Sequence, residues 1–153
     1  MSILGFVLVV FGSFGRIWAS LYIEGNKTKN LVTSGPFSMV RNPLYFFSLI
    51  MLLGFSLALK AIYLPLALLL IFVIFHIPTI ANEERKLRTN HGDKFESYMK
   101  STPRLIPNIF KYKRPETGEK VLVKISRING VLIEVIGYLF LYTLIDIIYF
   151  ILD

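Results

Sequence analysis

Residues 44–81 read LYFFSLIMLLGFSLALKAIYLPLALLLIFVIFHIPTIA, and Lys60 is the only Lys, Arg, Asp or Glu among them. The apolar runs on its two sides, 44–59 and 61–81, are each long enough for a helix to cross a bilayer with some tilt. Because one residue separates them, they predict a tight helical hairpin with Lys60 reaching the interface at its tip. The run 44–59 is the shorter of the two, so it could also enter the membrane and return on the same side as a re-entrant segment.

Two further apolar runs, 3–23 and 128–152, stand on either side of this hairpin. The first contains Arg16 and the second contains Glu134 and Asp146. No positive charge precedes the first run, and it is too long for the apolar part of a signal peptide, so we expect a retained anchor. The sequence therefore predicts an all-α, multi-pass integral membrane protein with about four transmembrane helices.

Composition supports the membrane assignment and excludes several kinds of site. Hydrophobic residues make up 54% of the chain, above the roughly 45–50% of a soluble domain. The absence of cysteine excludes disulfides, thiolate zinc sites and a thiol nucleophile. With two histidines only, a histidine-based metal site is unfavoured, and we expect no metal. The length of 153 residues predicts one domain spanning 1–153.

The distribution of Lys and Arg predicts the orientation. Segment 82–127 holds 12 of the 17, and segment 24–43 holds three more, whereas the hairpin tip holds Lys60 alone. Positively charged segments stay in the cytoplasm, so both segments are expected there and both termini on the opposite side. The net charge of +7 then reflects topology and attraction to anionic lipid rather than nucleic-acid binding.

The two cytoplasmic segments carry recognisable local signals. Ser34-Gly35-Pro36-Phe37 predicts a turn, and Pro43 suits the first position of a helix. Residues 82–100 predict an amphipathic helix that continues from the apolar run 61–81 and breaks at His91-Gly92. Residues 102–107 predict an extended segment bounded by prolines, and residues 111–124 a loose polar linker.

Three groups of charged residues are candidates for chemistry. Glu83 and Glu84 end an apolar helix, so they are either a solvated acidic cap or a binder of a cationic group. Arg104 either anchors lipid phosphate or holds a carboxylate in its rigid fork. Arg16 and Glu134 lie at similar depth in their helices, so we expect a structural ion pair, with a role in a substrate cavity as the alternative.

Several motifs, in this order, resemble those of the isoprenylcysteine carboxyl methyltransferase family and the related phospholipid methyltransferases. The resemblance covers about residues 15–107. It rests on an Arg-x-Trp-Ala motif from Arg16, a Gly-Pro-Phe-x-x-Val-Arg-Asn-Pro-x-Tyr motif from Gly35, Glu83-Glu84, and then Leu87, His91-Gly92, Phe95, Tyr98 and Arg104-Leu105-Ile106-Pro107.

The resemblance implies a methyltransferase that uses S-adenosylmethionine (SAM), releases S-adenosylhomocysteine, and acts on a lipophilic or prenylated acceptor at the cytosolic membrane face. A carboxylate acceptor would be oriented by Arg104, whereas an amine would need a base such as Glu84. Catalytic roles thus fall to Arg104 and Glu84. The cofactor would be bound by Gly35, Pro36, Arg41, Asn42, Pro43, Tyr45, Glu83, Glu84 and Tyr98.

Three departures from the family pattern are visible. Asn42 replaces the usual histidine, Phe47 stands where glycine is frequent, and residues 111–153 have no counterpart in the motifs. Two alternatives remain open. One is a membrane reductase that uses NADPH, because steroid-reductase-like proteins share a similar C-terminal pattern, and the other is a non-enzymatic membrane scaffold. The oligomeric state is left open by the sequence.

Overall fold

The computed structural model describes residues 3–23, 30–59, 63–115 and 125–152. Every secondary-structure element with assigned bounds in these ranges is a helix, which confirms the predicted all-α class. They are α1 (Ile3–Ile23), α2 (Pro36–Met39), α3 (Pro43–Ala58), α4 (Leu64–His91), α5 (Asp93–Ser101), the 3-10 turn η1 (Ile109–Lys111) and α6 (Ile125–Leu152).

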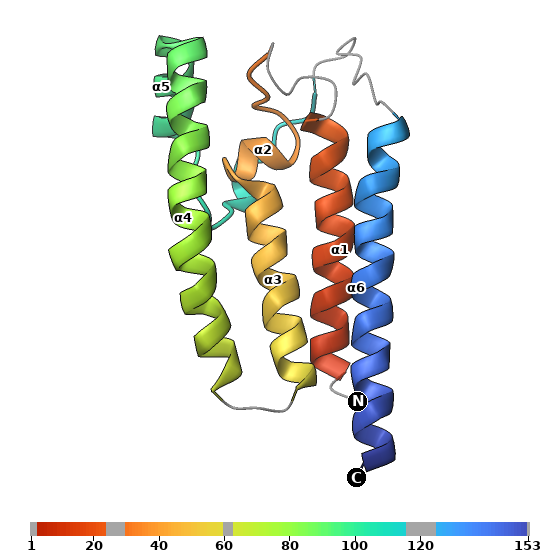
Figure 1. Ribbon diagram of the computed structural model, residues 1–153. Coiled ribbons are helices and arrows are strands. Elements are labelled where there is room, and N and C mark those ends of the chain that lie inside the picture. Colours follow the sequence, from red (N-terminus) through yellow and green to blue (C-terminus); the bar gives the residue numbers. More distant parts are fainter. Residues whose placement is uncertain (1–2, 24–29, 60–62, 116–124, 153) are drawn as a thin grey trace.

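The four long helices α1, α3, α4 and α6 lie side by side (Figure 1). Helices α1 and α4 and the part of α6 from Asn129 to Ile148 are long and apolar enough to cross a membrane. Helix α3 has 16 residues, or roughly 24 Å at 1.5 Å per residue. It runs beside most of α1 and begins lower than the basic end of that helix (Figure 1).

Glycines bring α1 and α3 into close contact. A Cβ on Gly12 would lie 2.8 Å from the Phe47 carbonyl oxygen, and one on Gly54 would lie 2.8 Å from that of Gly5. Small residues at such positions let two helix backbones approach each other within a membrane. The close packing fixes which face of α3 meets Arg16, and Ser48 lies on that face and bonds to Arg16.

The hairpin between α3 and α4 is wider than predicted. Helix α3 ends at Ala58 and α4 begins only at Leu64, whereas the sequence suggested a third helix from residue 61. Pro65 accounts for the later start, because proline is favoured in the first turn of a helix and disfavoured further inside. The predicted tip at Lys60 lies outside the described residues. At its other end α4 continues unbroken to His91, as the amphipathic pattern indicated.

The two segments predicted to be cytoplasmic meet at one end of the structure. Helices α2 and α5 lie there, whereas the start of α1 and the end of α6 lie at the opposite end (Figure 1). Portions 24–29 and 116–124 of these segments lie outside the described residues. The arrangement brings together residues that are 61 and 62 positions apart in the sequence, such as Phe37 with Tyr98 and Asn42 with Arg104.

The first residues of the predicted loose linker are in fact held in place. Gly35 N donates to the Lys113 carbonyl at 2.8 Å, and Lys113 N donates to Ser38 Oγ at 2.8 Å. Gly35 has a φ of 57°, a conformation that suits glycine. The prediction of a loose segment was wrong here because these bonds to Gly35 and Ser38 have no signal in local composition.

Candidate functional site

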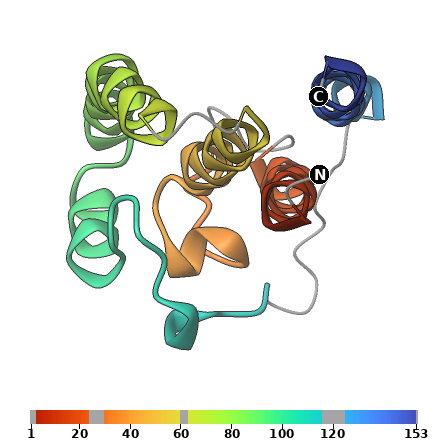
Figure 2. The same ribbon diagram turned by 90° about the horizontal axis from the view of Figure 1, so that it is seen from below.

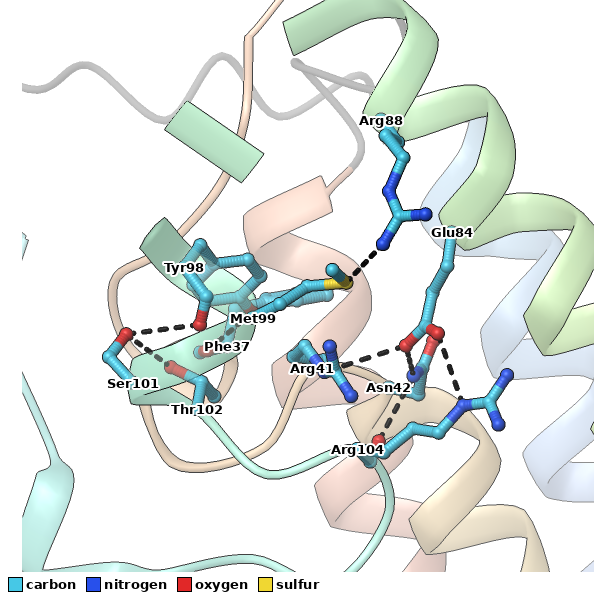
Figure 3. A network of polar contacts seen from close by, with 10 residues as sticks. All are labelled: Phe37, Arg41, Asn42, Glu84, Arg88, Tyr98, Met99, Ser101, Thr102 and Arg104. Carbon is cyan, nitrogen blue, oxygen red and sulfur yellow. Dashed lines mark hydrogen bonds and ion pairs between the residues drawn. The ribbon is translucent and has the colours of Figure 1, made fainter. Parts of the chain in front are cut away.

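Glu84 is the centre of a polar cluster at the basic end of the helices (Figure 3). Its Oε2 lies 3.1 Å from Arg104 Nε, and its Oε1 lies 3.5 Å from Arg41 Nε. The Glu84 side chain is only 14% exposed. Because a carboxylate withdrawn from water needs opposite charge nearby, the two arginines stabilise Glu84 in this inward position.

Asn42 ties three segments of the chain together at this cluster. Its Nδ2 donates to Glu84 Oε1 at 3.2 Å and to the Arg104 carbonyl at 3.0 Å. Next to it, Arg41 N donates to the Pro103 carbonyl at 2.9 Å. The loop before α3, the end of α4 and the segment after α5 are thus joined by direct hydrogen bonds.

Glu83 faces a different direction from Glu84, because successive residues of a helix point about 100° apart. It is exposed, and its Oε1 accepts a hydrogen bond of 3.2 Å from Tyr45 OH. The acidic pair therefore presents one carboxylate to the arginine cluster and one to the first turn of α3.

Tyr98 fixes α5 against α2. Its hydroxyl donates to the Phe37 carbonyl at 2.7 Å, and the residue is 7% exposed. Burial raises the pKa of the Tyr98 phenol above its usual value. The hydroxyl therefore stays protonated at neutral pH and remains a hydrogen-bond donor.

A cavity of about 90 Å³ lies beside these groups. Six of the residues predicted to bind the cofactor line it: Arg41, Asn42, Pro43, Tyr45, Glu83 and Tyr98. Glu84 and Arg104 adjoin this wall through Asn42. Most of the predicted site residues are therefore close neighbours in the structure.

Gly35 and Pro36 are placed elsewhere. They are not part of the cavity wall. A Cβ on Gly35 would lie 2.2 Å from the Tyr22 ring, so this glycine allows the start of α2 to pack on α1. In the structure these two residues position α2.

Sequence reasoning assigned no functional role to the apolar residues that line the cavity, which are Ile23, Leu31, Val32, Phe37, Leu44 and Leu87. Leu87 follows Glu83 by one helical turn, so its position on the same face was available from spacing. Leu31 and Val32 lie in a loop without periodicity, and no sequence signal marks them.

The predicted pair of intramembrane charges is confirmed. Arg16 Nη2 donates to Glu134 Oε2 at 2.8 Å, and Arg16 Nη1 donates to Ser48 Oγ at 2.6 Å. Tyr138 OH donates to Glu134 Oε1 at 3.2 Å. These bonds connect α1, α3 and α6.

Among the described residues, no group of three or more His, Cys, Asp or Glu side chains could hold a metal ion.

The fold and the site define a helical membrane protein with a charged, partly enclosed site at one end of its helices. The chain belongs to the phospholipid methyltransferase family, whose model matches residues 1–94. The matched part contains Asn42 and Glu84, and Arg104 and α6 lie beyond it. The family resemblance inferred from the sequence motifs is thereby confirmed, and the protein is a member of a family of membrane methyltransferases.

Two curated proteins are similar to this chain. The nickel-cobalt-cadmium resistance protein NccN of Alcaligenes xylosoxydans xylosoxydans is 33% identical over 113 residues, which are 74% of this chain and 53% of that protein. The cobalt-zinc-cadmium resistance protein CzcN of Cupriavidus metallidurans is 34% identical over 114 residues, 74% of this chain and 52% of that protein. The chain spans about half the length of these relatives. No solved structure matches.

Proposed function

We propose that this protein is a methyltransferase that binds SAM beside Glu84 and methylates a lipophilic acceptor. The observation that carries the proposal is the contact of Asn42 with both Glu84 and Arg104. Family membership supports methyl transfer as the reaction type, and this contact supports the proposed location. SAM, when bound, would supply a methyl group on a positively charged sulfonium.

The charges of the site fit the amino-acid end of SAM. That end carries one carboxylate and one ammonium group. Arg41 and Arg104 have the geometry that suits a carboxylate, and Glu83 and Glu84 provide acceptors for an ammonium. Two positive and two negative side chains balance one another, so a zwitterionic group adds no net charge to the site. Asn42 adds an amide where the family usually has a histidine ring.

The cavity has to enlarge when the cofactor binds. Its volume of about 90 Å³ is below the roughly 300 Å³ at which small-molecule sites begin. Arg104 is the side chain best placed to move, because it is 38% exposed while its partner Glu84 is 14% exposed. Rotation of Arg104 toward solvent would uncover Glu84 without unfolding a helix.

The acceptor and the orientation follow from the membrane setting. A site at the end of membrane-spanning helices can be reached by a molecule that is dissolved in the bilayer. We place this end on the cytosolic side and both termini on the other side, because most Lys and Arg residues belong to it. The family resemblance leaves the polar group of the acceptor open: Arg104 would orient the oxygen of a carboxylate acceptor, whereas a neutral acceptor would not use this side chain.

Binding calorimetry on the purified full chain in detergent tests the proposal. S-adenosylhomocysteine is expected to bind with measurable heat, and NADPH is expected to give none. Binding of NADPH alone would favour a membrane reductase instead. Heat from neither ligand, with a folded protein verified by circular dichroism, would favour a scaffold and contradict the enzymatic assignment.

A further inference from the structure

A second cavity, of about 290 Å³, lies within the membrane-spanning part. Its polar wall is formed by residues of the four long helices α1, α3, α4 and α6. These residues are Arg16, Ser48, His76, Glu134 and Tyr138. Viewed along the helices, α4 and α6 stand on either side of α3 (Figure 2). The volume is close to the lower limit of known small-molecule sites, roughly 300 Å³.

The formal charges in this wall cancel. Arg16 and Glu134 are ion-paired at 2.8 Å, and they are the only Lys, Arg, Asp or Glu side chains among the lining residues. A charged guest would have to separate them, which is costly in a region that excludes water. The cavity is therefore suited to a neutral molecule.

His76 indicates which polar group that molecule carries. Its Nδ1 lies 3.2 Å from the Phe72 carbonyl oxygen, which can only accept a hydrogen bond. In a neutral imidazole one nitrogen donates and the other accepts, so Nε2 is left as the acceptor. Within the described residues no hydrogen bond to Nε2 is formed. The stacking of the His76 ring on Phe72, with centroids 4.3 Å apart, holds the ring in this orientation.

Tyr45 links the two cavities. It lines the smaller one beside Asn42, and its ring lies 5.5 Å from the His76 ring, edge to face. Along α4, His76 precedes Glu84 by eight residues, or roughly 12 Å. A lipophilic molecule in the larger cavity would thus have its polar end directed at the proposed cofactor site.

We propose that the cavity between α1, α3, α4 and α6 binds the methyl acceptor as a neutral lipophile whose polar end donates a hydrogen bond to His76 Nε2. A long-chain alcohol, a phenol or an uncharged amine has this chemistry, and a carboxylate lacks it. In the transfer, the S–CH3 bond of SAM would break to give S-adenosylhomocysteine, the methyl group would join the acceptor oxygen or nitrogen, and the acceptor's proton would pass to His76 Nε2. The assignment as acceptor rests on the proposed function. The binding site itself does not, because none of the residues that line this cavity belongs to the proposed cofactor site.

Photolabelling of the full chain in phosphatidylcholine vesicles without SAM tests the proposal. The probes are a twelve-carbon alcohol and a twelve-carbon carboxylate, each with a diazirine on the chain and compared at equal bilayer concentration. The alcohol is expected to label the cavity residues Leu52, Phe55 and Phe72, and excess dodecanol to compete. The carboxylate is expected to label them three- to tenfold less, the effect of one hydrogen bond.

Three variants make the outcome specific. Leu52→Trp fills the cavity and is expected to reduce labelling at Phe72 at least fivefold, whereas Leu66→Trp on the exposed face of α4 is expected to leave it unchanged. His76→Phe keeps the ring stacking and is expected to remove the preference for the alcohol. Uniform labelling along the lipid-facing helices would overturn the site, and equal labelling by both probes would overturn the ligand class. Neither outcome depends on whether S-adenosylhomocysteine binds.

Discussion

Glu84→Gln is expected to weaken the binding of S-adenosylhomocysteine at least tenfold in calorimetry. The substitution keeps the shape of the side chain and removes the charge that faces Arg41 and Arg104. A hydrogen bond to a charged group contributes about 1.5–3 kcal/mol, and 1.4 kcal/mol corresponds to a factor of ten.

Glu96→Gln is the matched control for this variant. Glu96 is also paired with an arginine, Arg88, at 2.7 Å, but both side chains are more than 40% exposed and the pair lies outside the cavity. The affinity of the Glu96→Gln variant for S-adenosylhomocysteine is expected to equal that of the wild type. Wild-type affinity in Glu84→Gln, with unchanged thermal unfolding in both variants, would remove Glu84 from the site.

Breaking the Arg16–Glu134 pair is expected to destabilise the protein more than removing it completely. Arg16→Met and Glu134→Leu should each lower the free energy of unfolding by about 3 kcal/mol, because each leaves an uncompensated charge among the helices. The double variant should recover to within about 1 kcal/mol of the wild type, since apolar residues can replace a buried pair. Unfolding by sodium dodecyl sulfate in mixed micelles measures all three.

The exposed Arg88–Glu96 pair provides the comparison cycle. Its side chains are 57% and 41% exposed, so the coupling between Arg88→Met and Glu96→Gln should stay below about 1 kcal/mol. Additive losses in the Arg16 and Glu134 variants would contradict a direct interaction between these two side chains within the membrane.

Most of the fold follows from hydrophobic runs whose length is set by the bilayer. The run 3–23 coincides with α1 because only Arg16 and small residues interrupt the apolar sequence there, and because every backbone group in a bilayer must be bonded internally. The pairing of Arg16 with Glu134 follows from equal depth, since an unpaired charge would be costly. The start of α4 at Leu64 was missed because a proline was read as part of a continuous run rather than as the beginning of a helix.

The candidate site was less accessible to sequence reasoning. Family motifs indicated Asn42, Glu84 and Arg104, but their contacts depend on loop backbone that local composition does not encode. The bond from Arg41 N to the Pro103 carbonyl joins residues 62 positions apart. The intramembrane cavity was harder still to predict, because its lining residues Phe55 and Phe72 resemble every other apolar residue in their helices. In the sequence, its position is marked chiefly by the charged residues Arg16 and Glu134 and by His76.

A crystal structure of the full chain grown from a lipidic phase with S-adenosylhomocysteine tests the location of the proposed site most directly. The amino-acid end of the ligand is expected within hydrogen-bond distance of Asn42 and Glu84, with Arg104 moved from its present contact. Ligand bound at any other surface, with the Glu84–Arg104 pair and the small cavity unchanged, would contradict a cofactor site at this end of the helices.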